Sequence, residues 1–194
     1  RKYLIDIDGY IIYDHIGEGG YEETEQAIEK ALAERNARLN IDLPISSSAS
    51  KPIDSMDADS NKVGSPEIYF GSDRNERLSN GSRGVSGTQT FVIPKSIVLN
   101  NLYLGGSWNI TPEFIESTDD SSIVFRYKAK NVYFVAGSGN GTQIEVYKDD
   151  KLLKSISVKE EKLYKVIEDT ESSEHTLIIK IKGSGLKAFT FTFG

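Results

Sequence analysis

The chain has 194 residues, 38% of them hydrophobic, which is enough for one full domain with a packed core and a smaller piece. Its net charge of −6, with lysines and acidic residues interspersed, gives no basic surface for nucleic acid. The sequence has no apolar run long enough to predict a membrane span, and the absence of cysteine excludes disulfides, thiolate metal sites and a cysteine nucleophile.

Residues 1–36 predict a β-hairpin followed by a helix. YLIDIDG reads as a strand that ends in an Asp8-Gly9 turn, and YIIYDHIG reads as the returning strand. From Tyr21 the apolar residues follow a helical period, with acidic residues early and basic residues late, as the helix dipole favours. Both strands carry apolar residues on both faces, and one helix covers only one of them. We therefore expect another domain or a second chain to cover the other face.

Residues 37–65 are rich in Ser, Asp, Asn and Pro and show no period, so they predict a linker. Within them Asp57, Asp59 and Asn61 imitate the start of a calcium-binding EF-hand loop. The imitation fails at the last ligand position, where Ile68 stands in place of the glutamate that would bind calcium with both oxygens. A solvated acidic linker is the preferred interpretation, and we expect neither a metal site nor a cofactor in the chain.

Residues 66–194 predict a mainly β domain, a jelly-roll β-sandwich organised around Ser122–Gly137. We interpret that central stretch as two strands with a break near Lys130-Asn131. Further strands are expected at Glu67–Phe70, Asn101–Leu104, Glu113–Ser117, Gln143–Lys148, Lys151–Val158, Lys162–Glu168, Thr176–Lys182 and Lys187–Phe193. Alternating phenylalanines of the last strand are expected to face the core: Phe189, Phe191 and Phe193.

The second half of the central stretch is apolar on both faces. Val132 and Phe134 share one face, whereas Tyr133 and Val135 make the opposite face apolar as well. Monomers seldom expose a large apolar patch unless it marks a contact site. We therefore expect Tyr133 and Val135 to be covered by the Gly-, Ser- and Asn-rich loop Gly71–Gly87, by the hairpin–helix piece or by a second molecule, which would make the protein a homo-oligomer.

One aromatic group has the composition of a sugar site. Tyr103 and Trp108 lie near Asn101 and Asn109, and aromatic rings bind sugars by stacking on their apolar faces while polar side chains supply hydrogen bonds. These four residues are the candidates for glycan binding. The alternative, which we prefer for Trp108, is that the only tryptophan of a β-sandwich fills one end of its core.

The sequence offers no catalytic motif. His15 and His175 are the only histidines, and their spacing to serines, acids and each other indicates neither a Ser-His-Asp arrangement nor a metal pair. We interpret both as solvated or hydrogen-bonded surface histidines.

Three positions match the acceptor pattern for N-glycosylation, namely Asn80, Asn109 and Asn140. The pattern has meaning only in an organism that glycosylates exported proteins. In most bacteria these matches would arise by chance, so they are candidates and no more.

Several segments together resemble a known protein family. YLIDIDGYIIYDHIGEGGYEETEQAIEKAL resembles the closing hairpin and helix of a TlpA-like thioredoxin domain. SPEIYFGSDR, LYLGGSW, VFRYKAKNVYFVAG and KAFTFTFG resemble the domain that follows it in DipZ-type thiol–disulfide interchange proteins. The two blocks occur in the family's order and at a similar spacing, so the resemblance covers nearly the whole chain outside the linker.

The resemblance implies a location and a neighbour. Family proteins carry a thioredoxin-like domain outside the cytoplasm, often tethered to a membrane domain, followed by a jelly roll similar to carbohydrate-binding modules. Their redox chemistry rests on a Cys-x-x-Cys pair and a cis-proline, and neither is present here. Because the chain starts with Arg rather than Met, we expect its true start upstream, with the cis-proline directly before Arg1. No catalytic residue is therefore carried over.

We interpret the chain as the non-catalytic carboxy-terminal portion of an extracytoplasmic thioredoxin-like protein, whose sandwich binds a glycan or a protein of the cell envelope. Two alternatives stay open. The sandwich is a structural or oligomerisation scaffold without a glycan ligand, or the chain is the tail of an active thiol–disulfide oxidoreductase whose cysteines lie upstream of Arg1. In each case the chain itself, having no thiol, is expected to lack redox activity.

Overall fold

The computed structural model describes residues 1–16, 20–45 and 64–194. The chain divides into two compact units, Arg1–Asn61 and Lys62–Gly194. Most of the predicted linker, including the residues that imitate an EF-hand, lies outside the described residues. Within the described part, no helix is long and apolar enough to span a membrane.

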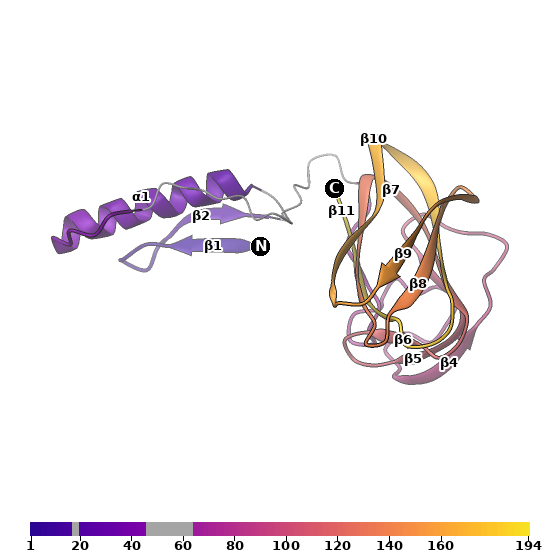
Figure 1. Cartoon of the computed structure of the whole chain (residues 1–194). Helices are drawn as coiled ribbons and strands as arrows, with labels where there is room; N and C mark the ends of the chain where they lie inside the picture. The colour runs from indigo at the N-terminus through magenta and orange to yellow at the C-terminus, as the bar shows by residue number, and fades with distance from the viewer. Residues whose placement is uncertain (17–19, 46–63) are drawn as a thin grey trace. The chain divides into compact units, whose positions relative to one another are not determined.

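The first unit contains the predicted hairpin and helix (Figure 1). Strands β1 (Lys2–Ile5) and β2 (Ile11–His15) pair in antiparallel fashion. Their turn is closed by Asp6, whose Oδ1 accepts hydrogen bonds from the amides of Asp8 and Tyr10 at 2.9 and 2.8 Å. Helix α1 (Tyr21–Leu39) extends past residue 36 and ends at Asn40, which adopts the left-handed conformation with φ 50°.

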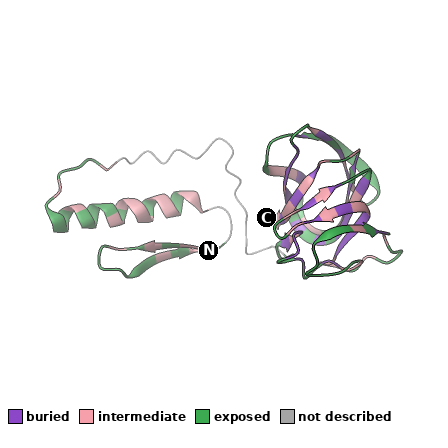
Figure 2. Ribbon diagram, turned by 90° about the horizontal axis from the view of Figure 1, so that it is seen from below, coloured by how far each residue is buried: buried purple, intermediate pink, exposed green. Residues whose placement is uncertain are grey.

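Most large apolar side chains of the hairpin are exposed to solvent (Figure 2). Its exposed large side chains are Tyr3, Ile5, Ile7, Tyr10, Ile11, Ile12 and Ile16. No residue of α1 is buried either. The hairpin and helix therefore do not build a core of their own.

The second unit is the predicted mainly β sandwich (Figure 1). Its strands are β3 (Ile68–Tyr69), β4 (Gly87–Phe91), β5 (Leu102–Ile110), β6 (Ile115–Ser117), β7 (Ser121–Gly137), β8 (Thr142–Lys148), β9 (Lys151–Val158), β10 (Lys162–Ile181) and β11 (Lys187–Phe193). They pair in the order β3-β11-β6-β5-β7-β10-β8-β9, with β4 joined to β5. Strand β4 was not predicted, because GTQTF lacks a clear apolar alternation.

The central strand β7 is continuous, which corrects the prediction of two strands. Its first half pairs with β5 through Ser122–Phe125, and its second half pairs with β11 through Val132–Gly137. The predicted break corresponds to a change of pairing partner. Opposite Lys130, strand β10 contains an irregularity between Glu168 and Ser173, where four residues face one.

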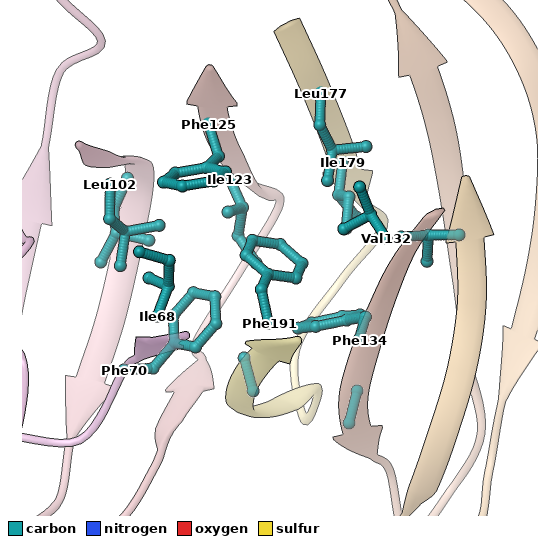
Figure 3. Packing of buried hydrophobic residues seen from close by; sticks show 14 of the residues in the cluster. Ile68, Phe70, Leu102, Ile123, Phe125, Val132, Phe134, Leu177, Ile179 and Phe191 are labelled. Carbon is teal, nitrogen blue, oxygen red and sulfur yellow. The ribbon is translucent and has the colours of Figure 1, made fainter. Parts of the chain in front are cut away.

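The core of the sandwich is closed by phenylalanine rings from several strands (Figure 3). The ring of Phe191 lies 5.0 Å from that of Phe134 and 5.2 Å from that of Phe70, measured between centroids. All three are essentially without solvent exposure. Such tilted and edge-on contacts stabilise aromatic pairs beyond the burial of their area.

Candidate functional site

A pocket of about 400 Å³ opens where three segments of the sandwich meet. It lies between the turn after β3, the β5–β6 connection and the bulged part of β11. Its lining residues are Tyr69, Gly71, Asp73, Arg74, Pro112, Glu113, Phe189 and Thr190. We call this site the Tyr69–Phe189 pocket.

Backbone hydrogen bonds hold two walls of the pocket together. The amide of Ser72 donates to the Thr111 carbonyl at 2.8 Å, and the amide of Asp73 donates to the Pro112 carbonyl at 3.1 Å. A Cβ atom on Gly71 would lie 2.3 Å from the Pro112 carbonyl oxygen. Only glycine permits this approach of the two backbones, so Gly71 fixes the shape of the pocket.

Phe189 reaches the pocket because of a bulge in β11. Ala188 pairs with Ala136 and Thr190 with Val135, so Phe189 is an extra residue in the ladder. The prediction that Phe189 faces the core is therefore wrong, whereas Phe191 and Phe193 do face it. The ring of Phe189 instead packs 5.3 Å from that of Phe114 and lines the pocket.

The polar groups of the pocket surround its aromatic rings. The Arg74 guanidinium lies 3.5 Å from the centre of the Tyr69 ring, a close cation–π contact. The Tyr69 hydroxyl donates to the Glu67 carboxylate, and this hydrogen bond, with partial burial, raises the pKa of Tyr69. Asp73 and Glu113 place exposed carboxylates at the rim. The pocket thus combines apolar ring surface with hydrogen-bonding groups of both charges.

The aromatic residues predicted to bind a glycan lie elsewhere. Trp108 has no solvent exposure, and its indole N–H donates to the Gly105 carbonyl at 3.0 Å. Trp108 is therefore a core residue, as in the alternative that we preferred. Tyr103 is 5% exposed, and its hydroxyl accepts a hydrogen bond from the Val98 amide. Asn101 and Asn109 are half-buried. Because neither ring presents a face to solvent, this set cannot serve as a stacking platform.

The predicted contact face is largely covered. Tyr133 is 4% exposed and Val135 is half-buried. Whether Tyr133 and Val135 support an assembly of several copies stays a prediction.

The glycosylation candidates differ in what their side chains do. Asn80 donates from its amide nitrogen to the carbonyls of Val92 and Leu104, at 3.0 and 2.7 Å, and accepts from the Leu104 amide. A glycan on that nitrogen would break this bridge. Asn109 is half-buried on β5, and Asn140 is exposed in the β7–β8 turn.

His175 is hydrogen-bonded, which is one of the two states expected for a surface histidine, but the sequence did not identify its partners. Its Nδ1 lies 2.6 Å from Oδ2 of Asp149 and its Nε2 lies 2.8 Å from Oγ of Ser173. Sheet pairing, not chain spacing, brings Asp149 to this position. Among the described residues, no group of three acidic or histidine side chains is arranged to hold a metal ion.

Only one segment of the pocket could be inferred from the sequence. Gly71 to Arg74 begin the Gly-, Ser- and Asn-rich loop that was expected to cover Tyr133 and Val135, and long loops of this kind often carry function. Tyr69, Glu113 and Phe189 were missed as pocket residues, because each sits in or beside a predicted strand where an apolar or alternating residue is unremarkable.

Comparison with solved structures finds weak likenesses. A family two carbohydrate esterase from Clostridium thermocellum, in complex with cellohexaose, is 16% identical over 43% of this chain and 27% of that chain, with a TM-score of 0.40. The module CsCBM6-3 from Clostridium stercorarium, in complex with cellobiose, is 18% identical over 67% of this chain and 95% of that chain, with a TM-score of 0.37.

A family two carbohydrate esterase from Cellvibrio japonicus is 13% identical over 66% of this chain, with a TM-score of 0.40. The matches span only 27% and 33% of the lengths of the two esterases. No curated protein matches the chain. A family model described as "Thioredoxin like C-terminal domain" matches residues 65–194, which is the whole sandwich and most of the chain. The chain therefore belongs to the family of thioredoxin-like C-terminal domains.

Proposed function

We propose that the sandwich is a glycan-binding module and that the Tyr69–Phe189 pocket is its ligand site. The module would serve an extracytoplasmic thioredoxin-like protein by holding it at a glycan of the cell envelope. It contributes no thiol–disulfide chemistry of its own, because the chain has no cysteine.

The observation that carries this proposal is the composition of the pocket. The Phe189 ring, turned out of the core by the bulge, offers an apolar face on which a sugar ring can stack. Asp73, Arg74 and Glu113 supply acceptors and donors for sugar hydroxyls around it. A volume of about 400 Å³ falls within the usual range of small-ligand sites.

The charges of the pocket favour neutral glycans over strongly acidic ones. Asp73 and Glu113 repel an anion, and the only cation of the lining, Arg74, is already engaged with the Tyr69 ring. A neutral sugar avoids this repulsion and uses the carboxylates as hydrogen-bond acceptors. We therefore expect neutral oligosaccharides to bind more tightly than uronic acid oligomers of the same length.

The test is a calorimetric titration of residues 64–194 with soluble neutral, amino and acidic oligosaccharides. Binding should weaken about tenfold in Phe189→Ala, a change of ~1.4 kcal/mol. Tyr147→Ala is the control, because Tyr147 is a half-buried aromatic residue like Phe189 but lies on β8 and does not line the pocket. If the parent domain binds an oligosaccharide and Phe189→Ala binds it equally well, the glycan site lies elsewhere. If no oligosaccharide binds the parent domain, the proposed function is wrong.

A further inference from the structure

A second polar cluster lies where the β8–β9 turn meets the middle of β10. It is separate from the pocket and shares no residue with it. Its members are Tyr127, Lys148, Asp149, Asp169, Ser173 and His175. We call it the Ser173–His175 cluster.

A chain of hydrogen bonds joins a hydroxyl, an imidazole and a carboxylate in this cluster. Ser173 and His175 are two residues apart on β10, so their side chains lie on the same face. The Asp149 carboxylate can only accept, so Nδ1 of His175 carries the proton of the 2.6 Å bond. In the neutral ring Nε2 is then an acceptor, and the Ser173 hydroxyl donates to it at 2.8 Å.

Asp149 is held in place by the backbone. Its Oδ1 accepts from the Thr176 amide at 2.9 Å, and its own amide donates to the Thr176 carbonyl at 2.9 Å. Desolvation, the largest single effect, raises the pKa of Asp149, but the bonds from Thr176 and His175 outweigh it and leave that pKa below its usual value. Asp149 therefore stays ionised at neutral pH and fixes the imidazole in one tautomer.

The bulge of β10 adds a second carboxylate. Asp169 belongs to the four residues that face Lys130 alone, and bulges of this kind re-aim side chains. Its Oδ1 accepts from Lys148 Nζ at 2.5 Å, and its Oδ2 lies 3.9 Å from His175 Nε2. The carboxylates of Asp149 and Asp169 thus both lie near the ring of His175.

Two buried polar atoms in the cluster have no hydrogen-bond partner among the described residues. They are the Tyr127 hydroxyl and Oδ2 of Asp169. Buried polar atoms are nearly always paired, so an unpaired couple calls for an explanation such as a bound water or a ligand. The cluster therefore has free bonding capacity beside Ser173 and His175.

We propose that Ser173 is a nucleophile for acyl transfer, with His175 as its general base and Asp149 as the positioning residue. The substrate class is a small carboxylic ester. The hydroxyl, imidazole and carboxylate occupy the nucleophile, base and positioning roles that recur in such sites on unrelated folds, irrespective of residue order.

The reaction proceeds in two balanced steps. Ser173 Oγ bonds to the ester carbonyl carbon while its proton passes to His175 Nε2; the bond to the leaving alcohol breaks, and the alcohol takes that proton. Water then attacks the acyl-serine, giving its proton to His175, and Ser173 regains it as the carboxylic acid is released. No oxidant, reductant or metal enters the balance.

The experiment uses the full chain with p-nitrophenyl acetate and with a fluorophosphonate, which labels activated serines. Each reagent should add one label per protein molecule, and that label should lie on Ser173. Mass spectrometry of the intact and of the digested protein measures both. His175→Gln should slow labelling roughly 100-fold or more, the usual contribution of a general base.

Control variants distinguish a loss of reactivity at Ser173 from a loss of the fold. Ser155→Ala removes an exposed serine of β9 and should leave labelling intact. Asp149→Asn should slow labelling, because an amide no longer fixes the imidazole in one tautomer, and Asp149→Glu, which keeps the carboxylate, should restore part of the rate. Circular dichroism checks that each variant is folded. No label on Ser173 in the folded protein, or equal labelling of His175→Gln, would overturn the proposal and leave a purely structural hydrogen-bond network.

Discussion

The two units of the chain differ in how far their apolar side chains are buried. In the sandwich the core cluster, from Ile68 to Phe193, is buried by strands of the same unit. In the hairpin–helix unit, Ile11 is 61% exposed and Tyr10 is 71% exposed, and no residue of α1 is buried. The sandwich thus buries its apolar side chains between its own strands, whereas the hairpin and helix leave most of theirs exposed.

The largest expected difference is between the two units produced alone. Residues 64–194 should unfold in one cooperative thermal transition, since they contain the whole core and the bonds that tie Gly64 and Ser65 to Lys128. Residues 1–45 should show none as a monomer, because so short a piece buries too little apolar area. Calorimetry of both pieces decides. A cooperative transition of monomeric 1–45 would show that the comparison is wrong.

Single substitutions should repeat this contrast on a smaller scale. Phe134→Ala should lower the free energy of unfolding of the sandwich by ~3–5 kcal/mol, because its ring has no exposure and its removal leaves a cavity. Ile11→Ala should change that free energy by less than about 0.5 kcal/mol, as surface substitutions do. Urea titrations of the full chain measure both. Equal effects would contradict the assignment of the core to one unit.

A smaller effect should appear at alkaline pH. Desolvation, with the nearby charges of Asp169 and Asp149, raises the pKa of the buried Tyr127 above its ordinary value of 10.0. The neutral phenol is therefore favoured by folding, and its stabilising contribution is complete below about pH 10 and is lost above it, by up to ~1.4 kcal/mol per pH unit.

Tyr127→Phe isolates this effect from other alkaline titrations. The variant keeps the buried ring and removes the hydroxyl, so its stability should fall less between about pH 10 and 12 than that of the parent chain. Urea midpoints across this range give the comparison. Equal losses of stability in the two proteins would mean that Tyr127 ionises as readily in the folded chain as in the unfolded one.

Regular alternation made most of the sandwich predictable. The bounds of β9 and β11, Lys151–Val158 and Lys187–Phe193, match the predicted strands. The helix was predicted because its apolar period and early acidic residues agree with each other. Strand β4 was missed, since its residues are mostly polar and its place is fixed by pairing with β5.

The sites were harder to predict because irregularities create them. An even spacing of phenylalanines places Phe189 inward, and nothing in the alternation reveals the extra residue that turns it into the pocket. Asp149 and His175 are 26 residues apart, and only the pairing of β8 with β10 makes them neighbours. Bulges and sheet register are tertiary properties, which a single sequence specifies only through the whole fold.

The proposal that the pocket binds a glycan is tested most directly by amide shift mapping. Residues 64–194, labelled with nitrogen-15, would be titrated with the oligosaccharide that binds most tightly in calorimetry. The amides of Tyr69, Arg74, Glu113 and Phe189 should shift in a saturable manner, while those of the Ser173–His175 cluster stay unchanged. Saturable shifts confined to another face, or no shift with any oligosaccharide, would contradict the assignment.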